Sequence, residues 1–98
     1  MQQFMVEVSL PAKLTQEIIE LIPSQRNFID DLLQRGVILS YTLTLDRAML
    51  WVVFEVENSK EVRTYLNAFP IADYVQFTIH ELAFHNAADS VVPAISLN

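Results

Sequence analysis

The chain has 98 residues, of which 52% are hydrophobic and 18% are charged, and it contains no cysteine. Its net charge is −6 with only six Lys and Arg residues. This balance argues against nucleic acid or anionic membranes as partners, because phosphate recognition relies on clustered cations. The lack of cysteine excludes disulfides, thiolate metal sites and cysteine nucleophiles. A small domain this apolar predicts a second buried surface, most simply an interface between subunits.

No targeting or spanning segment is predicted. The N-terminus, MQQFMVEV, lacks a basic region followed by a long apolar run, as a secretory signal would have. No segment approaches the roughly 18 consecutive apolar residues of a transmembrane helix. We therefore expect a cytoplasmic protein.

The first predicted element is a strand over residues 3–10, QFMVEVSL, in which apolar and polar side chains alternate. A helix follows over residues 14–35, where apolar residues recur at helical spacing and Thr15 is placed to be the N-cap. Gly36, the only glycine, stands where a left-handed residue commonly ends a helix. Pro23 lies inside this helix and predicts a kink or a break.

Residues 37–56, VILSYTLTLDRAMLWVVFEV, predict two strands joined by a tight turn near Asp46 and Arg47. The second strand is apolar on both faces, which is typical of a strand inside a sheet. In the first strand, strict alternation predicts that one face carries Val37, Leu39, Tyr41, Leu43 and Leu45, and the other Ile38, Ser40, Thr42 and Thr44.

The rest of the chain predicts one short helix and one more strand. Asn58 opens the helix with a capping box completed by Glu61, and Pro70 ends it. Residues 73–84 read as the last strand. On that strand Val75, Phe77 and Ile79 alternate with Gln76, Thr78 and His80.

The order strand, helix, strand, strand, helix, strand is that of the ferredoxin-like α+β fold, βαββαβ. Two right-handed crossovers place both helices on one face of a four-stranded antiparallel sheet, with strands ordered fourth, first, third, second. We expect this domain to span residues 1–85. Residues 86–98 are a C-terminal tail that either packs on a neighbouring subunit or is frayed.

Two helices cover only one face of such a sheet. Each large apolar side chain left open on the other face forgoes about 1.5–3 kcal/mol of burial. A second copy of the chain, related by a two-fold axis, is the simplest cover, so a homodimer is expected. The apolar residues predicted on the open face are Met5, Ile38, Trp51, Val53 and Leu82.

Four stretches, FMVEVSLPAKL, LLQRG, WVVFEVENSKEV and LNAFPIADY, resemble the muconolactone delta-isomerase family of the dimeric α/β-barrel superfamily. The resemblance covers about residues 4–85. It implies dimers that pair through the open sheet face and stack into a larger ring. It also implies cofactor-free proton transfer on a small five-membered lactone, in the degradation of catechol to oxoadipate. The pocket implied lies between sheet and helices, close to subunit contacts.

The chain departs from this family where the family is cationic. The isomerase is rich in Arg, His and Trp after its first helix, and the matching stretch here is VILSYTL. The middle of its first helix is acidic and carries lysine, whereas this chain has PSQRN. Arg26 is therefore the one cation expected to remain for pairing with an anionic substrate.

Glu7 and His80 are the candidate catalytic pair. They stand on strands that the predicted order makes antiparallel neighbours, and they fall at similar heights. On a shared face, the carboxylate would orient the imidazole for general acid–base proton transfer. The alternative is a structural hydrogen bond within a subunit interface. Polar alternation adds Ser40, Thr42 and Thr78 as substrate-binding candidates.

Two aromatic residues extend the list of substrate-binding candidates. Tyr41 and Trp51 could line an apolar pocket, or anchor the core or an interface. No metal site is predicted, because His80 and Glu81 of the cluster that ends at His85 point to opposite faces of a strand. No organic cofactor is predicted either, and a chain with one glycine offers no Gly-rich phosphate loop.

Two functions from different classes remain open at this point. The first is a small cofactor-free isomerase that transfers a proton on a lactone or related organic acid, in a pocket near the dimer interface. The second is a non-catalytic ligand-binding or assembly module that kept the fold and lost the cationic site.

Overall fold

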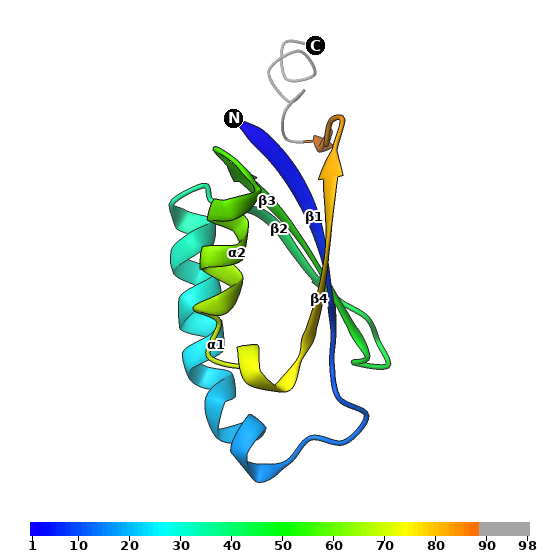
Figure 1. Ribbon diagram of the computed structural model, residues 1–98. Helices are drawn as coiled ribbons and strands as arrows, with labels where there is room; N and C mark the ends of the chain where they lie inside the picture. The colour runs from blue at the N-terminus through cyan, green and yellow to red at the C-terminus, as the bar shows by residue number, and fades with distance from the viewer. Residues whose placement is uncertain (89–98) are drawn as a thin grey trace, which may run out of the picture.

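The structure is a computed structural model that describes residues 1–88. The sheet order is β2-β3-β1-β4, with every neighbouring pair antiparallel, as predicted. Both helices lie on one face of the sheet (Figure 1). The packing predicted for the tail falls almost wholly outside the described residues. The elements are β1 (Gln2–Ser9), α1 (Gln16–Gln34), β2 (Ile38–Leu43), β3 (Met49–Val56), α2 (Ser59–Asn67), the 3-10 helix η1 (Ala72–Tyr74) and β4 (Gln76–Leu82).

Helix α1 has the predicted ends. The hydroxyl of Thr15 accepts a hydrogen bond from the N–H of Ile18 at 3.4 Å, and Gly36 adopts φ +73° just after the helix. The helix runs unbroken through Pro23, so the break that was one of the two predicted outcomes does not occur. Pro23 is exposed, and so is Ile19, whose carbonyl loses its helical partner. Water can bond to that carbonyl, which makes the proline tolerable there.

Helix α2 begins with the predicted capping box. The side chain of Asn58 accepts from the N–H of Glu61 at 3.0 Å. The Glu61 carboxylate accepts in return from the N–H of Glu57 at 3.4 Å, one residue earlier than in the usual motif. Both ends of the motif therefore satisfy backbone donors that the helix itself cannot pair.

Strand β2 differs from the prediction. Ile38 pairs with Phe54, and Ser40 pairs with Val53, so a β-bulge at Leu39 interrupts the alternation. Ile38 consequently faces the helices, where it is only 1% exposed, and its predicted place on the open face is wrong. A bulge adds one residue to one strand and so shifts which side chains share a face.

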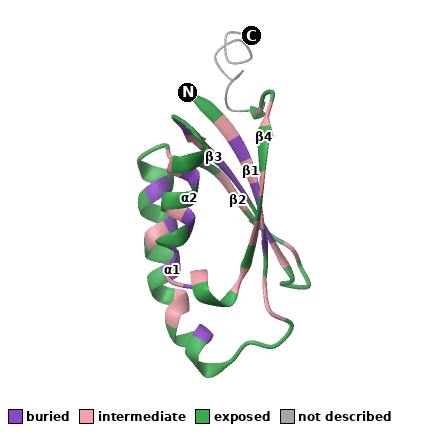
Figure 2. Ribbon diagram, in the orientation of Figure 1, coloured by how far each residue is buried: buried purple, intermediate pink, exposed green. Residues whose placement is uncertain are grey.

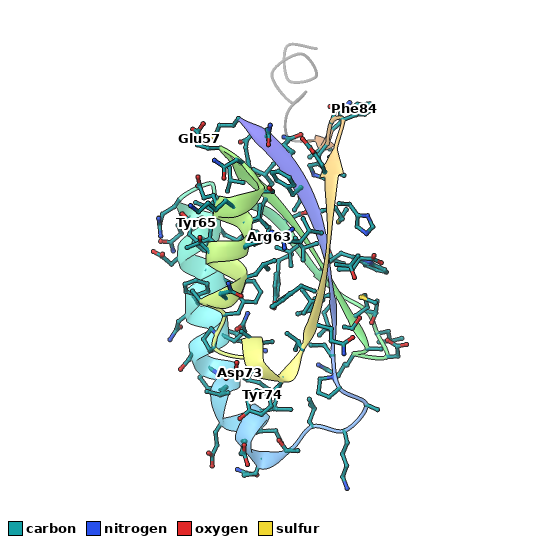
Figure 3. All side chains as sticks on the ribbon, viewed as in Figure 1. Glu57, Arg63, Tyr65, Asp73, Tyr74 and Phe84 are labelled. Atoms are coloured by element: carbon teal, nitrogen blue, oxygen red, sulfur yellow. The ribbon has the colours of Figure 1, made fainter. Side chains whose placement is uncertain are left out.

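Strand β4 is shorter than predicted. Asp73 and Tyr74 belong to η1, and the strand itself starts at Gln76. Tyr74, labelled in Figure 3, donates a hydrogen bond from its hydroxyl to the Glu17 carboxylate in the first turn of α1, at 2.9 Å. The segment between α2 and β4 is thus tied to α1, which holds it beside the helix.

The core lies between the helices and the sheet, and Figure 2 shows the buried residues gathered there. Two edge-to-face ring contacts join α1 to β4 through Phe69, which packs against Phe28 at 5.8 Å and Phe77 at 5.9 Å between centroids. The largest fully buried side chains are Phe4, Phe54, Leu32, Ile38 and Leu66.

The opposite face of the sheet has no cover within residues 1–88, and Figure 3 shows side chains projecting from it, away from the helices. Trp51 stands on this face between Glu7 and Thr42 and is 40% exposed. Val53 also faces this side but is only 1% exposed, and it stands between Met5 and Ser40 on the adjacent strands.

Candidate ligand pocket and the polar sheet face

A pocket of about 290 Å³ lies between the first half of α1 and the inner face of the sheet. Helix α1 contributes side chains spaced three or four residues apart, which places them on one face of the helix. The remaining wall comes from β2, β3, the turn between them, and the chain after β1 and after α2. The lining residues are Leu10, Leu14, Ile18, Ile22, Gln25, Arg26, Tyr41, Leu43, Arg47, Leu50 and Ile71.

Gln25 is the buried polar residue of this region, at 5% exposure. Its Oε1 accepts a hydrogen bond from the N–H of Ile71 at 3.3 Å, which ties α1 to the segment after α2. Its Nε2 is buried and finds no hydrogen-bond partner of ordinary geometry among residues 1–88. A buried donor without a partner costs about 1–3 kcal/mol.

Tyr41 stands next to this amide. Burial raises the pKa of the Tyr41 hydroxyl, and the neighbouring Gln25 side chain partly opposes that rise by lowering the pKa. The amide is therefore close enough to influence the phenol, although no hydrogen bond of ordinary geometry joins them. A hydroxyl with a raised pKa keeps its proton at neutral pH and is available as a donor.

Two arginines line the same pocket, Arg26 on α1 and Arg47 in the β2–β3 turn. Arg47 adopts φ +61°, a left-handed conformation that is uncommon for a residue with a side chain. That Arg26 is the one cation left to pair with an anionic substrate stays a prediction, and Arg47 is a second cation beside the same pocket. The short polar turn was recognised, but the place of Arg47 in the lining of this pocket was not.

The turn that presents Arg47 is closed by its own side chains. The hydroxyl of Thr44 donates to the Asp46 carboxylate at 2.6 Å, and the N–H of Ala48 donates to the same oxygen at 3.0 Å. The N–H of Met49 donates to the Thr44 hydroxyl at 3.2 Å. The hydrogen bonds from Thr44 and Ala48 lower the pKa of Asp46. They also fix the backbone that carries Arg47.

The candidate catalytic pair meets on the open face of the sheet. The Nε2 atom of His80 lies 2.8 Å from Oε2 of Glu7, and both side chains are partly exposed. His80 pairs across the strands with Met5, and Glu7 pairs with Thr78, so the contact is diagonal. The sequence therefore predicted this juxtaposition correctly.

The predicted site residues divide between the two faces of the sheet. Tyr41 and Arg26 line the pocket beside α1. The other six project from the opposite face, so the sheet separates them from that pocket. They are Glu7, Ser40, Thr42, Trp51, Thr78 and His80.

Other features of residues 1–88 add little chemistry. A second hollow of about 250 Å³ lies between α2 and β4, beside Arg63 and Phe77. Within these residues, no three His, Cys, Asp or Glu side chains are grouped as metal ligands would be. Neither helix of this part of the chain is long and apolar enough to cross a membrane.

Comparison with known proteins agrees with the architecture. A crystal structure of muconolactone isomerase at 3.3 Å resolution is similar to this chain, with a TM-score of 0.72 and 17% identity, over 88% of this chain and 93% of that one. At this identity the likeness establishes the fold alone. No curated protein matches the sequence. The family model for muconolactone delta-isomerase matches residues 3–88, and the chain therefore belongs to that family.

Proposed function

We propose that this chain binds a small organic anion, a lactone-bearing or related acid, in the pocket beside α1. The supporting observation is that Arg26 and Arg47 both line a mainly apolar cavity of about 290 Å³. The chain has only six Lys and Arg residues and a net charge of −6, so two cations at one pocket are a marked local reversal of its charge. Guanidinium groups are suited to carboxylates because they donate two parallel hydrogen bonds.

Calorimetric titration with pentanoate, pentan-1-ol and pentylammonium tests this proposal. Pentanoate should bind most tightly, and pentylammonium should not bind. Arg26→Ala and Arg47→Ala should each weaken pentanoate binding about tenfold, the loss expected for one charge-assisted hydrogen bond. Arg63→Ala, beside the other hollow, is the matched control and should bind like the wild type. Equal affinity for the acid and the alcohol would overturn the proposal.

A second candidate function is cofactor-free isomerisation, and the contact between Glu7 and His80 favours it. Glu7 would orient the imidazole, and His80 would take a proton from one carbon of the ligand and return it to another. This pair lies across the sheet from the pocket, so the reaction would occur on the open face, between two copies of the chain. The family to which the chain belongs is consistent with such an activity.

An assay of muconolactone isomerisation separates the two functions. A binding protein should give no turnover above background. An isomerase that uses this pair should lose about 100-fold or more of its turnover in Glu7→Gln and in His80→Gln. Thr78→Val, on the same face, is the control and should keep most of the activity. Turnover that survives both substitutions would exclude the pair as the catalytic groups.

We also propose that two copies pair through the open sheet face. Trp51, Met5 and Leu82 lie on it, and nothing within residues 1–88 covers it. A face shared by two identical chains can bury its own apolar residues by two-fold symmetry. Sedimentation at micromolar concentration should therefore find a dimer.

A further inference from the structure

A hollow of about 250 Å³ lies between α2 and β4, and three apolar residues line it: Leu66, Phe77 and Ile79. Arg63 and Asn67, one helical turn apart on α2, line it as well, and Figure 3 shows Arg63 between α2 and β4. Within residues 1–88, Arg63 forms no ion pair. The hollow therefore suits an apolar side chain that has a carboxylate next to it.

The turn between β2 and β3 presents such a pair of side chains. Leu45 is 100% exposed, more than any other large apolar residue of the described chain, and Asp46 follows it. The two hydrogen bonds that Asp46 accepts both reach its Oδ1, so its Oδ2 can accept from another molecule. The N–H of Arg47 donates to the carbonyl of Thr44 at 2.9 Å, which closes the turn. A turn held in this way loses little conformational freedom when it docks.

We propose that Leu45 of one copy enters the hollow between α2 and β4 of another copy, where Asp46 pairs with Arg63. Apolar cavities of about 150 Å³ accept benzene in other proteins, so a hollow of about 250 Å³ accommodates a leucine side chain. The turn and the hollow are different surfaces, so the contact is heterologous and links chains head to tail. It is separate from pairing through the open sheet face and joins dimers into larger assemblies.

Assembly as a function of concentration tests this contact. One leucine and one exposed ion pair make a weak contact, so we expect dimers at micromolar concentration and larger species at about 1 mM. Sedimentation equilibrium and small-angle X-ray scattering over this range measure the change. A wild type that stays dimeric at about 1 mM would overturn the proposal and leave the hollow to some other occupant.

Two matched variants show whether the turn is responsible. Leu45→Ser removes the apolar side chain and should weaken association between dimers about tenfold or more, while the dimers themselves persist. Phe84→Ser is the control. Phe84 is also largely exposed, at 72%, but its neighbours Ala83 and His85 carry no carboxylate for Arg63. Association that survives Leu45→Ser, or that falls equally in Phe84→Ser, would refute the role given to the turn.

Mixing two defective variants tests the pairing of turn with hollow. Arg63→Glu places a second carboxylate opposite Asp46 and should also abolish the larger species. Chains with Leu45→Ser keep an intact hollow, and chains with Arg63→Glu keep an intact turn. A mixture should therefore regain part of the association that neither variant shows alone. A mixture that stays dimeric would refute the contact, because a heterologous contact needs one intact surface from each chain.

Discussion

The two sides of the sheet differ in whether their polar groups have hydrogen-bond partners. On the open face, polar side chains satisfy one another: His80 contacts Glu7, and the Gln3 amide donates to Glu55 at 3.2 Å. On the other side of the sheet, Gln25 of α1 is buried and its Nε2 has no hydrogen-bond partner within residues 1–88. Satisfied groups suit a surface that assembles, whereas an unsatisfied group in a cavity suits a ligand. This difference supports the proposals that two copies pair through the open face and that a ligand binds on the other side of the sheet.

The largest effect is expected on the open face. Trp51→Lys should raise the dissociation constant of the dimer about 1,000-fold, because each of two symmetric tryptophans loses roughly 2 kcal/mol and the new charge must be desolvated. Sedimentation over a range of concentrations measures this change. Pentanoate affinity should stay within about twofold, since the pocket lies on the other side of the sheet.

The control for this substitution is Leu45→Lys, at the fully exposed tip of the β2–β3 turn. It adds the same charge outside the open face and should leave the dimer intact. A Trp51→Lys protein that remains dimeric would show that the open face is not where the copies meet.

A smaller effect, with opposite signs in two measurements, is expected at Arg47. Arg47→Gly should weaken pentanoate binding about tenfold, because one guanidinium is removed. The same change removes the strain of a left-handed backbone, which costs a residue with a side chain roughly 1–2 kcal/mol. Glycine also gives the unfolded chain more conformational freedom, and this offsets part of the gain in stability. Urea unfolding should therefore show unchanged or slightly higher stability.

The matched comparison for Arg47 is Arg26→Ala on the regular backbone of α1. It should weaken binding by a similar factor without the relief of backbone strain. If Arg47→Gly binds pentanoate as tightly as the wild type, then Arg47 does not contribute to anion binding in the pocket. The proposal that two arginines attract the ligand to this side of the sheet would then fail.

Much of this architecture could be predicted from the sequence. The strand order predicted Glu7 and His80 at similar heights on neighbouring strands, in contact if they share a face, and the regular register of β1 and β4 brings them together on one face. The bulge at Leu39 escaped prediction, since an inserted residue on an edge strand leaves no signal in the hydrophobic pattern, and Ile38 was assigned to the wrong face. Gln25 was not among the predicted site residues, because its burial and its unpaired amide depend on packing that the sequence pattern does not show.

The smallest effect is expected at Asp46, in the turn that presents Arg47 to the pocket. Hydrogen bonds from the Thr44 hydroxyl and the Ala48 N–H lower its pKa in the folded protein below the ordinary value of about 3.8. A lowered folded pKa means that the carboxylate stabilises the fold above the unfolded pKa, and that this contribution disappears as the pH falls through the folded pKa. Asp46→Asn keeps an acceptor oxygen for the turn but cannot titrate.

Thermal unfolding of the wild type and Asp46→Asn between pH 7 and pH 2 tests this expectation. The wild type should be slightly more stable at neutral pH, and the difference should shrink below about pH 4, where the unfolded carboxylate takes up a proton. Because the same hydrogen bonds hold the backbone at Arg47, pentanoate affinity at neutral pH should fall slightly in the variant. A gap in stability that does not change with pH would mean that the carboxylate's charge contributes nothing, and that Arg47 is presented by the backbone of the turn alone.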